Sequence, residues 1–545
     1  MTFHPTLASR FELLQTDPGD PLFCNYVLEH QVRLLTAPAY PGTLWSPPFF
    51  YPEKNVLAYS ENFMGELPLY GLFRLAAPPL RSYQLLVILL PLLCFAAMLV
   101  LLRRLEVRPL LAALGAFWFA FSMPRAAQIG HLQLLPAFYA PLVLLALLAM
   151  LASPRRDRLL LLLALLYLQL LASIHLGWLL LFSLLFLVPL LLLFDPSGRQ
   201  RLMLFCRRHP VSLALSLLAW AAATLLTFRP YLQAGAQLGL RDWHTVELFL
   251  PRWKSWLSVP PGSWYAGRLH FFPPGTPVVW EHYLFAGLVF TALTLFAAWR
   301  LLRRRAEARQ QPPLALACWG TALAMVALSL YLPRFALEGG RLVKLGPGWS
   351  LWWGVYQLVP GAAAIRAVGR ISIVVYLTLA LAVCCGVEAA ARRSRLRRPA
   401  QAAVLLLLLA AAVVEQVQTH LPAFPGSRFT SDVAALRAVI PRGCKAAYVS
   451  LCPAKGFLLT QLEAMWVGLE AGVPVVNGYS GNFPPGYPNP TVDATPETLR
   501  KWSGEDPCIV PGCAAAAGSP HRAAGIQCQG IEWQSRGVRH SRLFR

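Results

Sequence analysis

The chain has 545 residues, of which 13% are charged and 57% hydrophobic, whereas roughly 25% of an average soluble domain is charged. Apolar runs recur along most of its length, and this pattern excludes a soluble enzyme in favour of a membrane-spanning bundle. The net charge of +23 comes mostly from short Arg clusters between apolar runs, which argues against a nucleic-acid partner.

The first segment, residues 1–83, is polar, aromatic and rich in Pro, and it contains no run long enough to cross a membrane. No cleavable signal peptide is visible at its start. A helix lying in the membrane interface is expected over Asn25–Leu35.

Apolar runs follow through residues 84–420, and their lengths suit helices that cross a bilayer. The predicted fold is therefore mostly α, a polytopic transmembrane bundle of about ten helices. The runs are Leu85–Leu102, Leu110–Met123, Pro136–Ala152, Leu159–Ile174, Gly177–Phe194, Val211–Phe228, Tyr283–Trp299, Leu314–Leu332, Ile371–Ala390 and Ala402–Val417.

Every second connection between these runs is rich in Arg, so all the clusters fall on one side of the membrane. By the positive-inside rule that side is the cytoplasm. The clusters comprise Arg103, Arg104 and Arg108; Arg155, Arg156 and Arg158; Arg199, Arg201, Arg207 and Arg208; Arg300, Arg303, Arg304, Arg305 and Arg309; and Arg392, Arg393, Arg395, Arg397 and Arg398.

This topology places residues 1–83, the loops 229–282 and 333–370, and the tail 421–545 outside the cytoplasm. An external first segment without a signal needs something to carry it across the membrane. We expect an upstream helix that this chain lacks; translocation by the following helix is the alternative.

The tail is expected to be a small extracytoplasmic α/β domain. Strands are predicted at Ala446–Leu451 and Val473–Val476, with helices near Thr430–Val439, Gly456–Leu469 and Pro496–Ser503. Its cysteines are Cys444, Cys452, Cys508, Cys513 and Cys528. One or two disulfides are expected, with Cys508–Cys513 the nearest pair, and a zinc site is the rival interpretation.

Acidic residues of the first segment are the leading candidates for chemistry. Asp17 and Asp20 flank a Pro-Gly pair, Glu29 and His30 lie in the expected interfacial helix, and Glu61 follows an aromatic stretch. A carboxylate at the membrane surface can take a proton from an acceptor hydroxyl or hold a divalent cation against a phosphate. The alternative is a turn that the Asp side chains cap.

Several cations lie on the outer side, where the positive-inside rule does not predict them. Arg366 and Arg370 are four residues apart at the start of a predicted helix and share one face. Arg229 lies at the outer end of another predicted helix. Such residues either bind an anion or extend to the lipid headgroups. His131 and Glu281 lie in outer connections and are candidates to line the same cavity, although a structural role for His131 is the simpler reading.

A turn in the tail presents an aromatic ring between two glycines, at Asn477-Gly478-Tyr479-Ser480-Gly481. Asn477 and Tyr479 are candidates for carbohydrate contact. The alternative is a turn that ends a strand.

Several strings taken in order resemble bacterial, largely uncharacterised (YfhO-like) members of the GT-C superfamily of integral membrane glycosyltransferases. They are QTDPGD at 15–20, LEH at 28–30, WSPPFFYP at 45–52, AYSE at 58–61, GHLQL at 130–134, LVPG at 358–361 with residues 365–370, and VNGYSGNFPP at 476–485.

The resemblance implies an inverting transferase that takes a sugar from a polyprenyl-phosphate donor at the outer face of a bacterial inner membrane. An acidic residue in the first external loop would be catalytic, which matches Asp20 or Asp17, with Asp20 favoured. Arg366 and Arg370 would hold the departing lipid phosphate. Glu61 stands where the family has Asp. No cofactor is required with certainty, a divalent cation is possible in principle, and the acceptor is a glycan, lipid or protein.

Two other functions fit the same pattern. A transporter or flippase of a lipid-linked saccharide would place ionisable residues at mid-membrane, in broken helices. A non-catalytic assembly protein with a sugar-binding tail would leave the acidic and Arg residues without a shared cavity.

Overall fold

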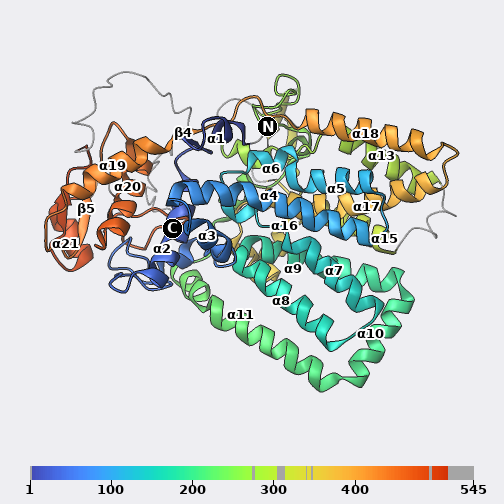
Figure 1. Ribbon diagram of the computed structural model, residues 1–545, viewed down its shortest axis with the longest axis horizontal. Coiled ribbons are helices and arrows are strands. Elements are labelled where there is room, and N and C mark those ends of the chain that lie inside the picture. The colour runs from blue at the N-terminus through green and yellow to red at the C-terminus, as the bar shows by residue number, and fades with distance from the viewer. Residues whose placement is uncertain are drawn as a thin grey trace.

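The computed structural model describes residues 3–272, 276–303, 313–338, 341–344, 348–489 and 494–513 (Figure 1). Most of these residues are helical, and the strands among them are short. The prediction of a mostly α chain is therefore confirmed.

Seven helical segments in the described ranges are long and apolar enough to cross a membrane, by length and composition. They are α4 (Pro79–Arg104), α5 (Pro109–Phe121) with α6 (Met123–Ala127), η2 (Leu132–Leu134) with α7 (Tyr139–Ala152), α9 (Ile174–Phe194), α11 (Pro210–Leu238), η6 (Val368–Ile371) with α17 (Ser372–Arg392), and α18 (Arg398–Glu415).

The other three predicted runs are also helical but shorter. They form α8 (Arg156–Ala172), α13 (Leu288–Arg303) and α15 (Pro313–Ser329), of 17, 16 and 17 residues. Each of the ten predicted runs therefore overlaps a helix, and seven of them reach membrane length.

The remaining helices are short or lie beside the bundle. They are α1 (His4–Ala8), α2 (Asp20–Thr36), α3 (Leu67–Arg74), α10 (Pro196–Arg208), α12 (Trp243–Leu248), α16 (Trp352–Leu358), α19 (Gly426–Ala438), α20 (Gly456–Ala471) and α21 (Pro496–Ser503), with 3-10 turns at Val56–Tyr59, Trp253–Leu257, Val279–His282 and Ala362–Ala364. The strands are β1 (Leu13–Leu14), β2 (Phe335–Glu338), β3 (Arg341–Lys344), β4 (Phe424–Pro425), β5 (Ala447–Val449) and β6 (Cys508–Val510).

Local sequence explains most helix ends. α4, α5, α11 and α18 have Pro in the first turn, where a missing N–H costs nothing. The prediction that the helix beginning at Val211 ends at Phe228 is wrong, because α11 continues through Pro230 to Leu238. A proline inside a helix removes one backbone hydrogen bond and causes a local clash, and a long apolar helix can continue past this distortion.

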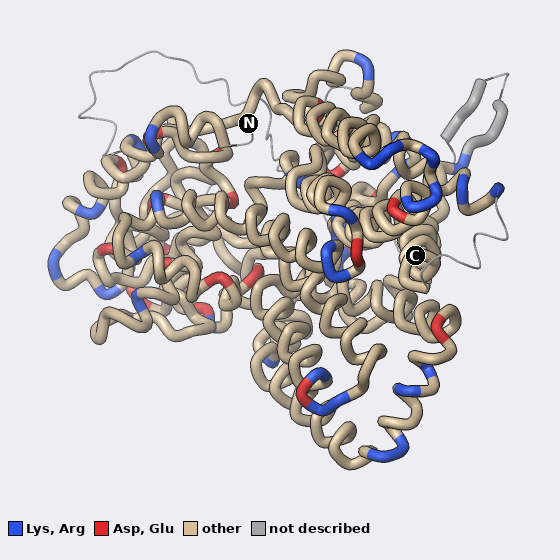
Figure 2. The backbone as a smooth tube through the Cα atoms, turned by 45° about the vertical axis from the view of Figure 1, so that its right-hand side comes forward, with Lys and Arg blue, Asp and Glu red and all other residues tan. Residues whose placement is uncertain are grey.

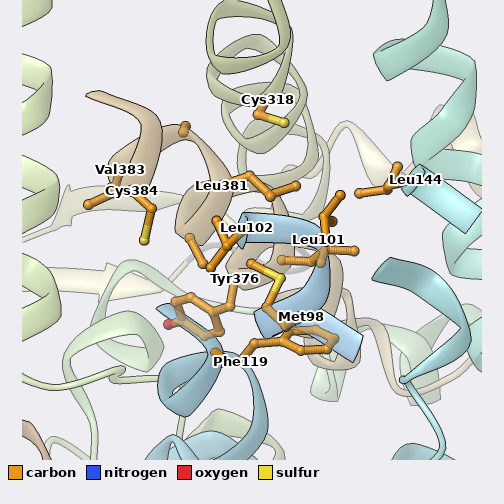
Figure 3. Packing of buried hydrophobic residues seen from close by; sticks show 14 of the residues in the cluster. Met98, Leu101, Leu102, Phe119, Leu144, Cys318, Tyr376, Leu381, Val383 and Cys384 are labelled. Atoms are coloured by element: carbon orange, nitrogen blue, oxygen red, sulfur yellow. The ribbon is translucent and has the colours of Figure 1, made fainter. Parts of the chain in front are cut away.

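The bundle core joins α4, α5, α15 and α17. Met98, Leu101, Phe119 and Tyr376 meet there, together with buried Cys384 (Figure 3). A Cβ at Gly115 would lie 2.5 Å from the Cys384 sulfur, so glycine is needed where α5 meets α17. Cys384 thus acts as a small packing residue, as the sequence indicates.

The Arg-rich connections lie at one end of the bundle, where α4, α5, α17 and α18 have neighbouring ends (Figure 1). Arg108 pairs with Glu388 at 2.8 Å, and Arg392 pairs with Glu106 at 3.5 Å, so the first and last clusters are in contact. Figure 2 shows Lys and Arg at turns and helix ends, with the helix interiors mostly uncharged. The Arg-rich stretch at 304–309 lies outside the described residues.

The first segment and the tail pack together at the other end. β1 pairs with β4 in antiparallel fashion, with Leu13 opposite Pro425. α2 covers the helix expected at Asn25–Leu35, whose place in a membrane interface stays a prediction, and it contacts α3, α4 and α20. One buried cluster draws on residues 22–90 and 429–510.

The tail elements match their sequence signals. α19, α20 and α21 lie at the three expected helices, and β5 lies within the first expected strand. The second expected strand is reduced to one bridge between Val475 and Ala447, while β6 provides the parallel partner of β5.

Two disulfides join the β6 region to the segment around β5, and they are Cys444–Cys508 and Cys452–Cys513. The expected pair Cys508–Cys513 is therefore wrong. Because β6 runs alongside β5, Cys508 lies beside a cysteine 64 residues away rather than beside its near neighbour in sequence. Cys528 lies outside the described residues.

Candidate functional site

Asp20 lies where three distant segments meet. It is the first residue of α2, where the helix N-terminus favours a negative charge. Its Oδ1 accepts a hydrogen bond of 2.8 Å from the Tyr479 hydroxyl, and its Oδ2 lies 3.5 Å from His131 Nε2. The carboxylate is partly exposed, so one side remains open to a ligand.

Asp17 shapes the turn that precedes α2. Its Oδ1 accepts a hydrogen bond of 2.9 Å from the Gly19 amide, as in an Asx turn. A Cβ at Gly19 would lie 2.7 Å from that same oxygen, so the turn requires glycine. The turn interpretation thus describes Asp17 well, and the turn it forms presents Asp20.

Glu281 and Arg370 form a buried pair beside this group. The Arg370 guanidinium donates to Glu281 Oε1 at 2.8 and 3.1 Å, and Gln128 donates to Glu281 Oε2 at 3.3 Å. Burial opposes the charged form of Glu281, but Arg370 outweighs burial and holds the pKa of Glu281 below its ordinary value. Arg370 is therefore already neutralised within the protein.

His131 connects the two groups electrostatically. Burial lowers its pKa most, Arg370 lowers it further, and Asp20 and Glu281 oppose this effect. The imidazole is therefore neutral near pH 7. Asp20 and Arg370 both act on one ring, so they lie on the same side of the bundle.

Arg366 is the free cation of the predicted pair. Its guanidinium lies 5.5 Å from the centroid of the Phe249 ring, and no ion pair to a carboxylate forms with it among the described residues. Burial lowers its pKa first and Arg370 second, whereas Asp20 raises it. Because Arg370 lowers this pKa and Asp20 raises it, Arg366 lies within electrostatic range of both residues.

Arg241 is a further candidate for this site, which the sequence pattern did not single out. Burial lowers its pKa, and Arg366 lowers it further, so the two guanidinium groups lie within electrostatic range of each other. Its Nη2 donates to the Gly481 carbonyl at 3.3 Å, which ties it to the turn that carries Tyr479. The available signal was the same as for Arg366, an Arg in an outer loop.

Glu29 and His30 lie further along α2 and are engaged within the first segment. Glu29 binds Arg74 at 2.7 Å and accepts a hydrogen bond from Tyr70. His30 Nδ1 lies 2.8 Å from the Tyr40 hydroxyl, and burial lowers the pKa of His30 to about 4. These contacts join α2 to α3 and to the segment that follows α2.

Glu61 caps α9. It accepts hydrogen bonds from the Ser173 hydroxyl and from the amides of Ile174 and His175, at 3.3, 2.8 and 3.0 Å. Burial raises the pKa of Glu61, and these donors oppose the effect. A carboxylate at a helix N-terminus satisfies orphan amides, so its position is explained by the fold.

Arg229 and Asn477 lie apart from Asp20. Arg229 is exposed on α11, and its extension to lipid headgroups stays a prediction. Asn477 is buried and bonds both backbone groups of Val449 and the Gln461 side chain. It anchors the turn that delivers Tyr479.

Five of the strings that resemble the family, at 15–20, 45–52, 58–61, 130–134 and 476–485, meet in space. A Cβ at Gly478 would lie 2.2 Å from the Phe50 ring, and one at Gly130 would lie 2.7 Å from Thr16 Oγ1. Asn482 donates to the Tyr59 carbonyl at 3.1 Å. Within the described ranges, no group of three or more His, Cys, Asp or Glu residues could hold a metal ion.

No protein-family model matches the chain, and no curated protein matches it either.

Proposed function

We propose that the chain is an inverting membrane glycosyltransferase of the GT-C kind that uses a polyprenyl-phosphate-linked sugar. The observation that carries this proposal is the meeting of Asp20, His131 and Tyr479, from three distant segments, within electrostatic range of Arg366. An acidic base beside an unpaired guanidinium group is what sugar transfer from a lipid phosphate requires.

Each group has a role in the transfer. Asp20 takes the proton of the acceptor hydroxyl as that oxygen bonds to the anomeric carbon from the side opposite the phosphate. The bond between the anomeric carbon and the phosphate oxygen breaks, and the phosphate keeps the electron pair. Arg366 and Arg241 stabilise its charge, whereas Arg370 is committed to Glu281.

Tyr479 orients the base. Its hydroxyl donates to Oδ1 of Asp20, which leaves Oδ2, 3.5 Å from His131 Nε2, for the acceptor proton. A general base must point one acceptor oxygen at the proton that it removes, and the hydrogen bond from Tyr479 would hold Asp20 in such an orientation.

The proposed location is a bacterial inner membrane, with residues 1–83 and the α/β tail outside the cytoplasm. Two disulfides in the tail support this orientation, because disulfides persist in oxidising compartments. The Arg-rich connections lie at the opposite end of the bundle, which fits a cytoplasmic side. A transporter is less well supported, because Asp20, Glu281 and Tyr479 lie outside the membrane-length helices.

The test is sugar transfer from a panel of radiolabelled polyprenyl-phosphate sugars in proteoliposomes. Asp20→Asn should reduce transfer by about 100-fold or more, because it removes the base. Asp157→Asn is the matched control, since Asp157 is an exposed carboxylate in the Arg-rich end. Equal transfer by wild type and Asp20→Asn would remove Asp20 as the base.

A further inference from the structure

The loop between α12 and α13 carries tryptophans on its surface. Trp253 and Trp264 are 56% and 62% exposed, and Leu257 is also exposed. These side chains belong to residues 253–270, which we call the outer lobe. Tryptophan is enriched at the boundary between water and the acyl chains of a bilayer, so the depth of this lobe relative to the helices matters.

The outer lobe is fixed to the ends of two membrane-length segments. The Thr419 amide donates to the Gly262 carbonyl at 2.8 Å, just beyond the end of α18 at Glu415. The Ser263 hydroxyl donates to the sulfur of Met123, the first residue of α6, at 3.4 Å. The lobe therefore lies level with the helix ends that are opposite the Arg-rich connections.

One side of the outer lobe reaches into the helix bundle. The centroid of the Trp256 ring lies 6.0 Å from that of the Tyr376 ring, and Trp256 packs against the bundle core. Tyr376 is in the second turn of α17, which begins at Ser372. Trp253 and Leu257 belong to the same 3-10 turn as Trp256, so they lie at the depth of the first turns of α17. A membrane that α17 crosses would therefore have its surface at these exposed side chains.

The same loop is basic. Between Glu247 and Glu281 the chain contains Arg252, Lys254 and Arg268 and no acidic residue. Both flanking carboxylates bind groups outside the lobe. In the part of the chain that the structure describes, no carboxylate forms an ion pair with any of the three cations. The positive-inside rule predicts few cations on the outer side, so these three need another explanation.

Two of the three cations are available to an external anion. The Arg252 guanidinium lies over two aromatic rings of the protein, 5.5 and 6.0 Å from their centroids. Lys254 and Arg268 are exposed, and Lys254 Nζ lies 5.8 Å from the centroid of the Trp253 ring. A lipid phosphate with acyl chains beneath it would satisfy both the charge and the indole, whereas an acidic polymer in water would satisfy only the charge.

We propose that the outer lobe docks on anionic lipid headgroups of the surrounding membrane. Lys254 and Arg268 bind the lipid phosphates, and Trp253, Leu257 and Trp264 enter the layer just below them. This docking goes beyond sugar transfer and does not depend on it.

Depth-dependent quenching tests the docking. Purified full-length protein is placed in nanodiscs that contain phosphatidylglycerol and a phosphatidylcholine brominated either near the headgroup or at the end of the acyl chain. The fluorescence that disappears in the double variant Trp253→Phe, Trp264→Phe should be quenched by the shallow bromines and hardly by the deep ones. Trp502→Phe is the control, because Trp502 lies in α21 of the tail, away from the bundle (Figure 1), and its fluorescence should be quenched by neither. Lobe fluorescence that neither lipid quenches, or that the deep bromines quench more, would overturn the proposal.

Hydrogen exchange tests the charge of the lipid. Replacing part of pure phosphatidylcholine by phosphatidylglycerol should slow amide exchange of residues 253–270 by about tenfold or more, the effect of two cations at an anionic surface. Lys254→Gln with Arg268→Gln should abolish that slowing, and raised salt should weaken it. Arg442→Gln with Lys501→Gln is the matched control, since it removes the same charge from exposed positions in the tail.

Three outcomes of the exchange experiment would overturn the proposal. Equal exchange in the two lipid mixtures would show that lipid charge has no part in docking, and an equal loss in the tail variant would show that net charge alone is responsible. A soluble polyglutamate that slows exchange in pure phosphatidylcholine, without quenching by brominated lipid, would assign the lobe to an acidic partner in water instead. None of these measurements requires sugar transfer, so they decide this proposal separately from the transferase.

Discussion

His30 should make the stability of the protein depend on pH between 4 and 6.5. The ring is buried in α2 against the Tyr40 hydroxyl and the Leu44 carbonyl, and burial lowers its pKa from 6.5 to about 4. In that pH range His30 binds a proton in the unfolded chain but stays neutral in the folded protein. The stability from this histidine is therefore complete above pH 6.5 and is lost as the pH falls to 4.

The magnitude follows from the two pKa values. A shift from 6.5 to about 4 corresponds to about 3 kcal/mol in total. Lowering the pH from 7.5 to 5.0 should remove about 2 kcal/mol of this. Other groups titrate in the same range, since burial lowers the pKa of His282 to about 4 and raises that of Glu463 to about 7. Only a comparison between variants isolates His30.

The assay is urea unfolding in a fixed detergent, followed by Trp fluorescence, for wild type and His30→Gln. Trp466, one of 17 tryptophans, belongs to the same buried cluster as α2, so its surroundings change when α2 unfolds. Wild type should lose about 2 kcal/mol more than His30→Gln between pH 7.5 and 5.0. The control is His244→Gln, because the His244 side chain is 80% exposed. Parallel pH dependence of wild type and His30→Gln would refute the claim that a neutral ring is buried.

Three further changes probe the site. Glu281→Gln should lower the free energy of unfolding by about 3–5 kcal/mol in the same urea assay, because it leaves Arg370 buried without a counterion. Adding Arg370→Gln should restore part of that loss. Strictly additive losses in the double variant would contradict the pairing of the two residues. Glu61→Gln should cost about 1 kcal/mol by weakening the cap of α9, visible as a lower thermal midpoint. Tyr479→Phe should reduce sugar transfer about tenfold with the donor KM unchanged, and a raised KM alone would make Tyr479 a binding residue instead.

The helices were predictable because their signal is local. A membrane-length helix satisfies its own backbone hydrogen bonds, so a continuous apolar run is sufficient to identify it. Boundaries were harder, as α11 shows, because a proline near a helix end is compatible with either stopping or continuing. The last turns of α11 contact the first segment, where the Tyr231 hydroxyl donates to the Ser60 carbonyl and the Gln237 amide donates to Glu53, and the sequence does not reveal these contacts.

The pairing of Asp20 with Tyr479 was not predictable from spacing. The two residues are 459 positions apart, and the contact depends on how the tail packs on α2. Each residue was identified separately, as an acid beside a Pro-Gly turn and as an aromatic ring between two glycines. The partner of Arg370 was missed for a similar reason, since Glu281 is brought close by the turn before α13.

The two interpretations of the Asp17–Asp20 segment turn out to be compatible. Asp17 caps the turn through the Gly19 amide, which uses its carboxylate structurally. The turn in turn starts α2 at Asp20, whose carboxylate is held by Tyr479 and faces His131. The turn that Asp17 caps sets the direction of the Asp20 carboxylate, so capping by Asp17 does not exclude the base role proposed for Asp20. The cations also differ in their roles. Glu281 pairs with Arg370, and because the pair carries no net charge it repels Arg366 less than an unpaired Arg370 would. In the proposed function, Arg366 and Arg241 lie within electrostatic range of each other and are both available to the departing phosphate.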